Sequence, residues 1–260
     1  MLENRVNAVE GILKGIPDNT TVNLIVLYSG GFDSTALLDI AIKTKAKLEN
    51  IKNVYALHIE SNLIHEGKLE LEKEYTERFI SHINEDNNAD VKFLKVVRDI
   101  PELDEYAEYA ENSYDLLMVN TINSVVPFIG GAHLNIVLDG TLDRDSRVYH
   151  LPFYKDMVES FNKNFRKNEV WMEFPFLKID KLRILSYIIS KGLYEFCTCC
   201  EQPDLKEQFC YSCRDHTNAL IELLLENEVY GGTSPSAELD EKGIKFIKRE
   251  LTRILGGEWN

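Results

Sequence analysis

The sequence predicts an α/β fold, in which a parallel sheet carries helices on both faces and a small helical subdomain follows at the C-terminus. An apolar, β-branched run at 22–28 leads through a glycine turn into a helix-like run at 35–42. Two more strand-like runs, at 54–59 and 91–96, alternate with a helical pattern at 66–84. Strands that alternate with helices form parallel sheets, because each crossover places a helix against one face.

The other patterns complete this prediction. In chain order they are a leading amphipathic helix at 2–15, an acidic, tyrosine-rich helix or loop at 103–118, a helix at 120–134, a strand at 135–140, a polar helix-like stretch at 150–170, an extended segment at 173–177 and a helix at 181–193. A chain of 260 residues can build one core, or a core with a small subdomain. We therefore place a main domain at 1–180 and a C-terminal helical subdomain at 181–260.

The glycine turn reads Ser29-Gly30-Gly31-Phe32-Asp33-Ser34. Glycines let the backbone pass close to a bulky anion, and the free amides at a helix start attract that anion. Asp33 or Ser34 is expected to cap the helix. The turn lacks the Gly-Lys-Ser/Thr ending of the Walker loop and the third glycine of the dinucleotide fingerprint. It is therefore either a phosphate site of another kind or a simple turn with polar caps.

Composition excludes some classes of partner. There are 29 basic and 43 acidic residues, giving a net charge of −14. This balance argues against broad contact with nucleic acid or an anionic membrane. The N-terminus lacks a signal-peptide pattern and no apolar run is long enough to span a bilayer, so we expect a cytoplasmic protein.

All five cysteines lie between positions 197 and 213. Cys197/Cys200 and Cys210/Cys213 form two Cys-x-x-Cys pairs, the spacing of tetrahedral zinc sites. A site closed by four thiolates would be structural and would clip the C-terminal subdomain together. Cys199 replaces Cys197 or Cys200 as a ligand, or it is a buried free thiol. The alternative is an unliganded cluster of small hydrophobic residues.

The hexapeptide at 29–34 resembles the PP-loop, Ser-Gly-Gly-x-Asp-Ser, of the ATP pyrophosphatase superfamily. That resemblance implies an adenine nucleotide alpha hydrolase-like, Rossmann-like fold and an enzyme that splits ATP into AMP and pyrophosphate. It implies that Asp33 helps to position a Mg²⁺-bound leaving group. The implied nucleotide-binding residues are Ser29, Gly30, Gly31, Phe32, Asp33, Ser34, Leu57 and His58.

The PP-loop combined with the cysteine cluster resembles the 7-cyano-7-deazaguanine synthase (QueC) family. The matching patches include 140–145, Tyr149, 173–177 with Asp180-Lys181, and the cysteines with Ala219-Leu220. The resemblance implies ATP-driven conversion of 7-carboxy-7-deazaguanine, with ammonia, to the amide and the nitrile by a homodimer. The implied catalytic residues are Asp33, Ser34 and Lys181, and the implied substrate-binding residues are Asn120, Gly140, Arg144, Asp145 and Tyr149.

The chain departs from this family where the base and carboxylate would bind. Glu60–Ile64 replaces a Tyr-Gly-Gln stretch, Val119 replaces an arginine, and Glu207 replaces the first of three clustered cysteines. Two alternatives therefore stand beside the deazaguanine ligase: conjugation of the activated base to a protein partner in anti-phage defence, and a nucleotide-binding module without catalysis. A tRNA-modifying thiolase or lysidine-type ligase is weaker, because the chain has no basic stripe.

Each candidate residue also has a structural explanation. Lys181 contacts ATP phosphates or is an ordinary surface lysine. Arg144 grips phosphate or carboxylate, or pairs with neighbouring aspartates. Asp145 binds the acceptor or magnesium, or caps a turn. His58 lies near the expected adenine position or is a satisfied core histidine, and Tyr149 stacks on a planar base or packs in the core.

Overall fold

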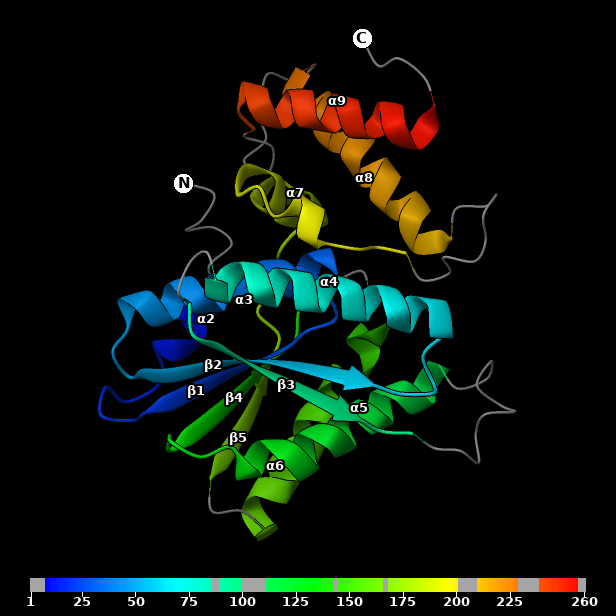
Figure 1. Ribbon diagram of the computed structural model, residues 1–260. Helices are drawn as coiled ribbons and strands as arrows, with labels where there is room; N and C mark the ends of the chain where they lie inside the picture. Colours follow the sequence, from blue (N-terminus) through cyan, green and yellow to red (C-terminus); the bar gives the residue numbers. More distant parts are fainter. Residues whose placement is uncertain are drawn as a thin grey trace.

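The computed structural model describes residues 8–85, 89–99, 111–142, 145–165, 168–200, 210–228 and 239–256. It contains one five-stranded sheet in which every pairing is parallel (Figure 1). The strands are β1 (Val22–Leu27), β2 (Ile51–Glu60), β3 (Val91–Val97), β4 (Leu134–Leu138) and β5 (Glu169–Glu173), in the order β3-β2-β1-β4-β5. The predicted parallel sheet is confirmed.

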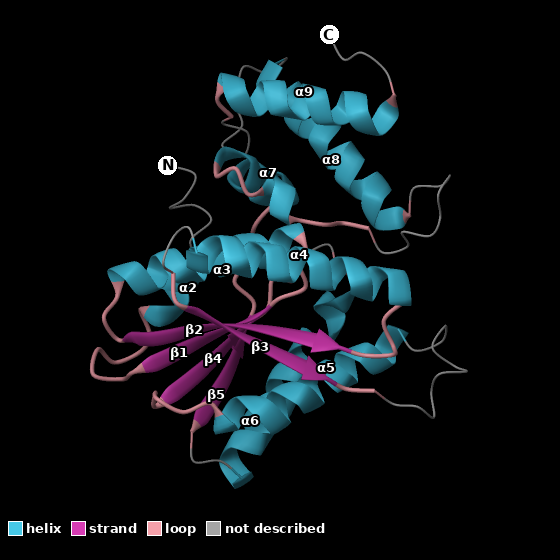
Figure 2. Ribbon diagram, in the orientation of Figure 1, coloured by secondary structure: helices cyan, strands magenta, loops and turns pink. Residues whose placement is uncertain are grey.

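Helices cover both faces of this sheet, as predicted (Figure 2). α3 and α4 lie on one face and α5 and α6 on the other, while α7, α8 and α9 form a further layer beyond α3 and α4. The helices are α2 (Ala8–Leu13), α3 (Phe32–Lys47), α4 (Glu66–Glu85), α5 (Glu111–Val125), α6 (Leu151–Phe165), α7 (Lys181–Ser190), α8 (Tyr211–Glu228) and α9 (Glu241–Leu255), with 3₁₀ turns η2 (Val126–Phe128), η3 (Ser146–His150) and η4 (Tyr194–Phe196).

Two hydrophobic cores follow from the alternation of side chains along the strands. Leu24 and Val26 of β1 face the core shared with α3, whereas Ile25 faces the core shared with α5 and α6. Tyr187 of α7 and Leu220 of α8 belong to the first of these cores. The layer made by α7 and α8 therefore packs continuously with the sheet domain, and the boundary predicted at residue 180 stays a prediction.

A row of buried amides fixes the register of the central strands. Asn53 donates to Asn23 across β2 and β1 over 2.8 Å, and Asn23 donates to Asn135 of β4 over 2.9 Å. Asn135 donates in turn to the carbonyls of Val126 and Ile129. A slip of one residue would bury unpaired amides and turn the apolar residues to the wrong face.

Several predicted element bounds were wrong. The predicted helix at 120–134 is instead the end of α5, the turn η2 and the start of β4, because Pro127 lacks an amide and Gly131 adopts a φ of +90°. The extended segment predicted at 173–177 is displaced, since β5 ends at Glu173. The predicted leading helix is described only as Ala8–Leu13, and residues 1–7 lie outside the described part.

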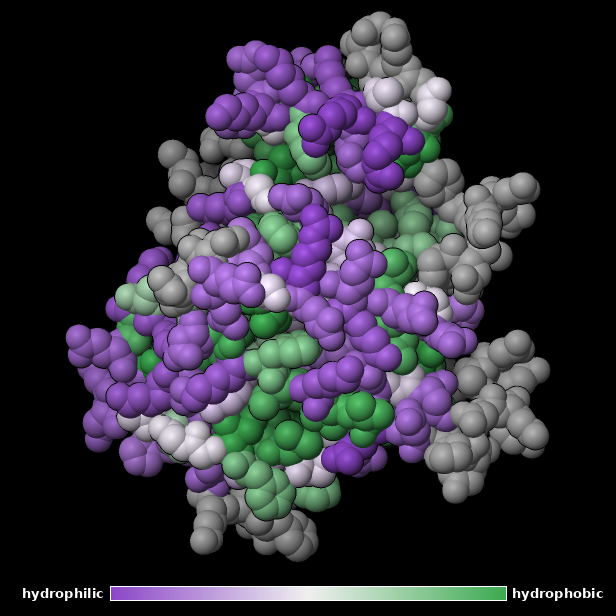
Figure 3. Space-filling view, viewed as in Figure 1, coloured by the Kyte–Doolittle hydropathy of each residue, from purple (hydrophilic) through white to green (hydrophobic). Residues whose placement is uncertain are grey.

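The surface seen in Figure 3 is largely hydrophilic over α4, α8 and α9, with hydrophobic side chains gathered lower, towards the sheet and α6. Among the described residues, no helix combines the length and the apolar character needed to cross a membrane.

Candidate active site

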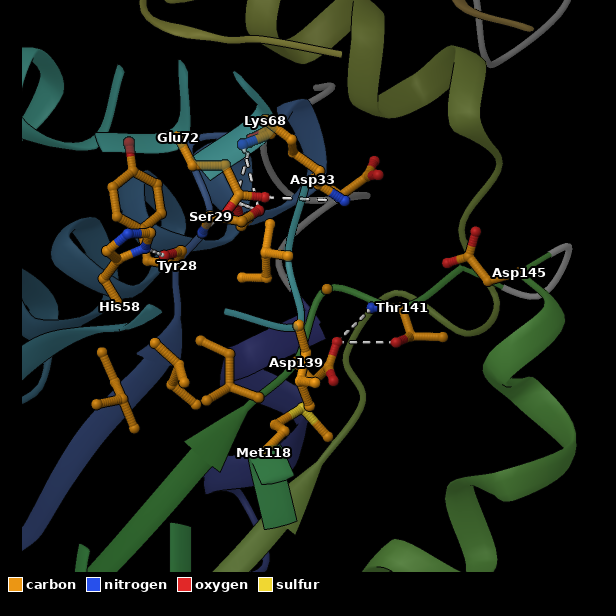
Figure 4. A pocket seen from close by; sticks show the side chains of 18 of the residues that line it. Tyr28, Ser29, Asp33, His58, Lys68, Glu72, Met118, Asp139, Thr141 and Asp145 are labelled. Carbon is orange, nitrogen blue, oxygen red and sulfur yellow. Dashed lines mark hydrogen bonds and ion pairs between the residues drawn. The ribbon is translucent and has the colours of Figure 1, made fainter. Parts of the chain in front are cut away.

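A cavity of about 530 Å³ opens at the carboxyl ends of β1, β2 and β4. The strand order reverses between β1 and β4, and open α/β sheets bind ligands at such a switch point. In Figure 4, Tyr28 and His58 lie on one side of the cavity and Thr141 and Asp145 on the other. The lining residues include Leu27, Tyr28, Ser29, Gly31, Asp33, Ser34, Leu57, His58, Ile59, Lys68, Glu72, Met118, Asp139, Gly140, Thr141 and Asp145.

The glycine turn forms the phosphate-sized part of this wall. Gly30 has a φ of +76°, and a Cβ there would lie 3.1 Å from the Cβ of Tyr75, so α4 passes too close for a larger residue. Ser29 Oγ lies 3.3 Å from Ser34 Oγ, and Ser34 Oγ donates to the Gly31 carbonyl over 3.2 Å. The loop thus brings together two hydroxyls, a glycine backbone and the amino end of a helix. These are the groups that bind phosphate at helix starts.

The predicted helix cap was wrong. α3 begins at Phe32, and its N-cap is Gly31, which has no side chain to accept from the first amides. Asp33 and Ser34 instead lie in the first turn of the helix. An uncapped start leaves amides available to an anion from the cavity.

Asp33 is the most perturbed acid at this site. Its Oδ1 is fully enclosed and has no hydrogen-bond partner within the described part of the chain. Burial raises the pKa of Asp33 to about 7, against the opposing charge of Lys181 and with help from Asp145 and Asp215. A Cβ on Gly140 would lie 3.3 Å from the Asp33 backbone, so a glycine is needed where β4 ends. Near neutral pH this carboxyl is therefore only partly ionised, and an approaching cation would favour its charged form.

The opposite wall is mainly apolar and includes both predicted β2 residues, Leu57 and His58. His58 Nδ1 lies 2.9 Å from the Tyr28 carbonyl oxygen, which can only accept, so Nδ1 carries the proton. Burial lowers the pKa of His58, which keeps the ring neutral. With Ile59 and Met118 these side chains make a surface suited to a flat, uncharged ring.

Some predicted site residues lie elsewhere. The Phe32 ring is buried in the core and stacks on His216 at 4.4 Å, so only its backbone belongs to the loop. Asn120 lines a separate cavity beside Arg98. Tyr149 is 89% exposed, so it does not pack in the core, which was its structural explanation. It does not line the first cavity either. Arg144 lies outside the described residues.

Lys181 begins α7 and forms an ion pair with Asp215 of α8 rather than lining the cavity. Asp180 caps the same helix, accepting from the Leu182 amide over 2.9 Å. The positive charge of Lys181 partly offsets the rise that burial causes in the pKa of Asp33, so the ammonium acts on the site electrostatically.

Sequence reasoning missed Asp139, Thr141, Lys68 and Glu72. Asp139 Oδ1 accepts from the backbone amide and the hydroxyl of Thr141 over 3.0 Å and 2.8 Å (Figure 4). Its position directly after an apolar strand was a usable signal, because that strand end faces the cavity. Lys68 and Glu72 lie on an ordinary solvated helix pattern, which carried no such signal.

The cysteines gather beside this site. The Sγ atoms of Cys200, Cys210 and Cys213 all lie within 4.8 Å of one another, and Cys199 Sγ lies 3.9 Å from Cys213 Sγ. Thiolates about 3.8 Å apart are what a tetrahedral zinc ion with bonds of about 2.3 Å requires. The donor set therefore fits a thiophilic metal ion.

Cys197, which the spacing pairs with Cys200, lies outside this group. Its Sγ donates to the Leu193 carbonyl over 3.4 Å, and its side chain is part of the hydrophobic core. Burial raises the pKa of Cys197, which keeps it a thiol. The residue replacing it near the cluster is Cys199, one of the alternatives left open by the sequence. Glu207 lies outside the described residues.

No protein-family model and no curated protein matches the chain. The U34-tRNA thiolase NcsA from Methanococcus maripaludis, whose structure holds a [4Fe-4S] cluster, is similar over 99% of this chain and 81% of its own, with a TM-score of 0.52 and 13% identity. The fold is that of the PP-loop Rossmann-like proteins. NMN synthetase from Francisella tularensis is less similar, with a TM-score of 0.42 and 14% identity over 97% of this chain and 92% of its own.

Proposed function

We propose that this chain is an ATP-dependent adenylating enzyme that activates a carboxylate for attack by nitrogen. The observation that carries the proposal is the loop 29–34, whose glycine, hydroxyls and uncapped helix start line a cavity at the switch point of a parallel sheet. A turn with only a structural role would need no cavity beside it.

The reaction follows from what this wall can hold. A carboxylate oxygen of the acceptor attacks the α-phosphorus of ATP, and the bond from that phosphorus to the bridging oxygen breaks. Pyrophosphate leaves with the bridging oxygen, and the α3 amides with Ser29 and Ser34 donate hydrogen bonds that stabilise its negative charge. An amine then attacks the acyl carbon and displaces AMP, losing one proton. The protein supplies orientation and charge stabilisation, and no nucleophile of its own.

Three carboxylates line the cavity from separate parts of its wall, and one or more of them would contact a magnesium ion that arrives with ATP. They are Asp33, Asp139 and Asp145, and oxygen ligands of this kind suit Mg²⁺. When bound there, the ion would neutralise charge on the leaving pyrophosphate. The apolar wall from Leu57 to Ile59, with Met118, would hold the adenine ring.

The proposed acceptor is 7-carboxy-7-deazaguanine or a related acid, and the nitrogen donor is ammonia. The support is the combined resemblance of the PP-loop, the 140–145 patch and the cysteine cluster to the deazaguanine enzymes. Because the segments expected to contact the base differ, a protein amine is the alternative donor, as in a defence system that modifies a partner. Zn²⁺ is the proposed metal, and the predicted homodimer is checked by light scattering on the purified chain.

The decisive experiment is AMP release. Zinc-loaded protein with ATP, magnesium, the carboxylate and ammonia should release AMP and pyrophosphate only when the acid is present. The Ser34→Ala variant should lose this release, whereas Ser190→Ala, which removes a hydroxyl bonded to the Tyr187 carbonyl in α7, should retain it. Nucleotide binding without AMP release under all these conditions would instead support a binding module. Acid-dependent AMP release with a mass increase on a co-expressed partner would support conjugation.

A tRNA thiolase is the second candidate, favoured by one observation. Three rather than four Sγ atoms form the group within 4.8 Å, and the structurally similar thiolase holds an iron–sulfur cluster. Metal analysis and absorption spectra of protein purified without oxygen separate the two candidates. Bound zinc without iron supports the ligase. Bound iron and sulfide, together with a broad absorption band in the visible range, support the thiolase.

A further inference from the structure

The segment that leads into Cys199 and Cys200 lies directly against the loop 29–34, which we call the nucleotide loop. The Thr198 amide donates to the Gly30 carbonyl over 2.9 Å, and Gly31 and Thr198 form a parallel bridge. Thr198 stands immediately before Cys199 and Cys200. The chain leading into the cysteine group is therefore a short strand-like partner of the two loop glycines.

The second cysteine segment contacts the same loop from another side. Cys210 and Cys213 lie at the start of α8, and His216, one turn beyond Cys213, stacks on the Phe32 ring at 4.4 Å with an angle of 19° between the planes. His216 Nε2 lies 2.8 Å from the Tyr194 hydroxyl, which holds the imidazole in place. The first residue of α3 is thus held by the helix that begins at the cysteines.

The Lys181–Asp215 ion pair is a third link. Asp215 follows Cys213 by two residues, and Lys181 is the cation whose charge acts on Asp33 in the loop. The position of α8 therefore sets how close this ammonium stays to the loop carboxyl. All three contacts are made by residues within three positions of Cys200 or Cys213.

We propose that the metal at these cysteines positions the nucleotide loop, so that metal binding and ATP binding strengthen each other. Thr198, Phe32 and His216 are the positioning residues. Two consecutive glycines are costly to order, and a metal that joins the two flanking segments orders them before the nucleotide arrives. The inference rests on the proposed function only in requiring that the loop binds nucleotide. It differs from the predicted structural clip because the metal changes affinity at a second site.

The experiment is a thermodynamic linkage measurement on the full chain. A non-hydrolysable ATP analogue with magnesium is titrated calorimetrically into zinc-loaded and zinc-stripped protein. We expect Kd to be at least about fivefold lower in the loaded form, the lower range of measured coupling between sites. Zinc affinity, measured against a competing chelator, should rise by the same factor when the analogue is present, because coupling is reciprocal.

Two matched variants test whether the coupling depends on the contact between Phe32 and His216. Phe32→Leu removes the ring stacked on His216, and we expect its coupling factor to fall towards one while zinc affinity without nucleotide is retained. Phe93→Leu is the control, because Phe93 also stacks on a histidine, His58 of the cavity wall, but is remote from the cysteines. Any change it causes in analogue affinity should be equal with and without zinc.

Equal analogue affinity in loaded and stripped protein, with both forms folded by circular dichroism, would overturn the proposal and leave the proposed function standing. No binding in either form would overturn both. If the stripped chain unfolds, hydrogen exchange of the Thr198 amide in the loaded protein decides instead. Nucleotide should slow it at least about fivefold, and an unchanged rate would refute the coupling.

Discussion

Burial raises the pKa of Asp33 from 3.8 to about 7; the charge of Lys181 opposes this shift, and the carboxylates of Asp145, Asp215 and Asp139 add to it. The folded protein therefore binds a proton that the unfolded chain releases. Folding carries a free-energy cost from this group that is absent well below pH 3.8 and complete above about pH 7. We expect Asp33→Asn to abolish this cost. Relative to the variant, the wild type should lose on the order of 2 kcal/mol of stability from about pH 5 to about pH 8.

Urea unfolding of both proteins across this range checks the prediction. The matched control is Asp18→Asn, because Asp18 is an exposed acid in the turn before β1. The pH dependence of the Asp33→Asn difference is read relative to that of this exposed acid. A constant difference between wild type and Asp33→Asn would mean that Asp33 is already ionised in the folded protein.

Gly30 is the loop residue whose replacement should be most damaging. An alanine would adopt a φ of +76°, which costs about 1–2 kcal/mol for a residue with a Cβ, and would press on Tyr75 at 3.1 Å. Gly192→Ala is the matched variant, because Gly192 has a φ of +68° and open space around it. We expect Gly30→Ala to lose more stability than Gly192→Ala and to bind the ATP analogue at least about tenfold more weakly.

Thermal unfolding and calorimetry measure both quantities. Equal losses of stability in the two glycine variants would show that the contact with α4 is not restrictive. Unchanged nucleotide affinity in a folded Gly30→Ala protein would show that the loop conformation is not needed for binding.

Among the elements, the asparagine row across β2, β1 and β4 carries a separable stability prediction. Asn23→Ala would leave the Asn53 amide and the Asn135 and Gly130 oxygens without their partner. Asn135 is fully buried, whereas Asn53 is half-buried and Gly130 is exposed. One buried polar group left unpaired costs about 1–3 kcal/mol, so we expect a loss of about 2 kcal/mol. The row lies at the amino ends of the strands, far from the cavity, and analogue affinity should therefore be unchanged.

Asn84→Ala is the comparison for this row. Asn84 makes two hydrogen bonds, accepting from the amide and donating to the carbonyl of Val91, but it is only half-buried, so water can replace the lost partners. We expect a loss near 1 kcal/mol from chemical denaturation. A loss for Asn23→Ala no larger than this would mean that the row contributes little to register.

The elements also differ in how well the sequence predicts them. β1, β2 and β3 are predictable because their apolar runs are bounded by polar turns, and the PP-loop is predictable because its chemistry is local. β5 was displaced because its apolar run, Val170–Met172, has only three residues between two glutamates, too short a run to distinguish from a helix end. The asparagine row and the contact of Thr198 with Gly30 join residues far apart in sequence, and no local pattern encodes them.

At the scale of the whole molecule, the net charge of −14 separates the two candidate functions. Nucleic-acid affinity comes largely from basic side chains that replace counterions on phosphates. Several lysines near the sheet edge are already paired: Lys73 and Lys95 lie 3.3 Å and 2.6 Å from Glu60, and Lys155 lies 2.8 Å from Glu173. The pair with Glu173 is neutral, and the two lysines that share Glu60 keep a net charge of +1, so these groups present little positive potential to a polyanion.

We therefore expect no tRNA binding at micromolar protein in about 0.15 M salt, while the ATP analogue binds in the same sample. Gel-shift titrations at about 0.05 M and about 0.2 M salt provide the measurement, with the analogue as the internal control for folded protein. Submicromolar tRNA binding that weakens steeply with salt would reveal a basic surface despite the overall charge. It would favour the thiolase over the ligase, because a small carboxylate acceptor gives no reason for such a surface.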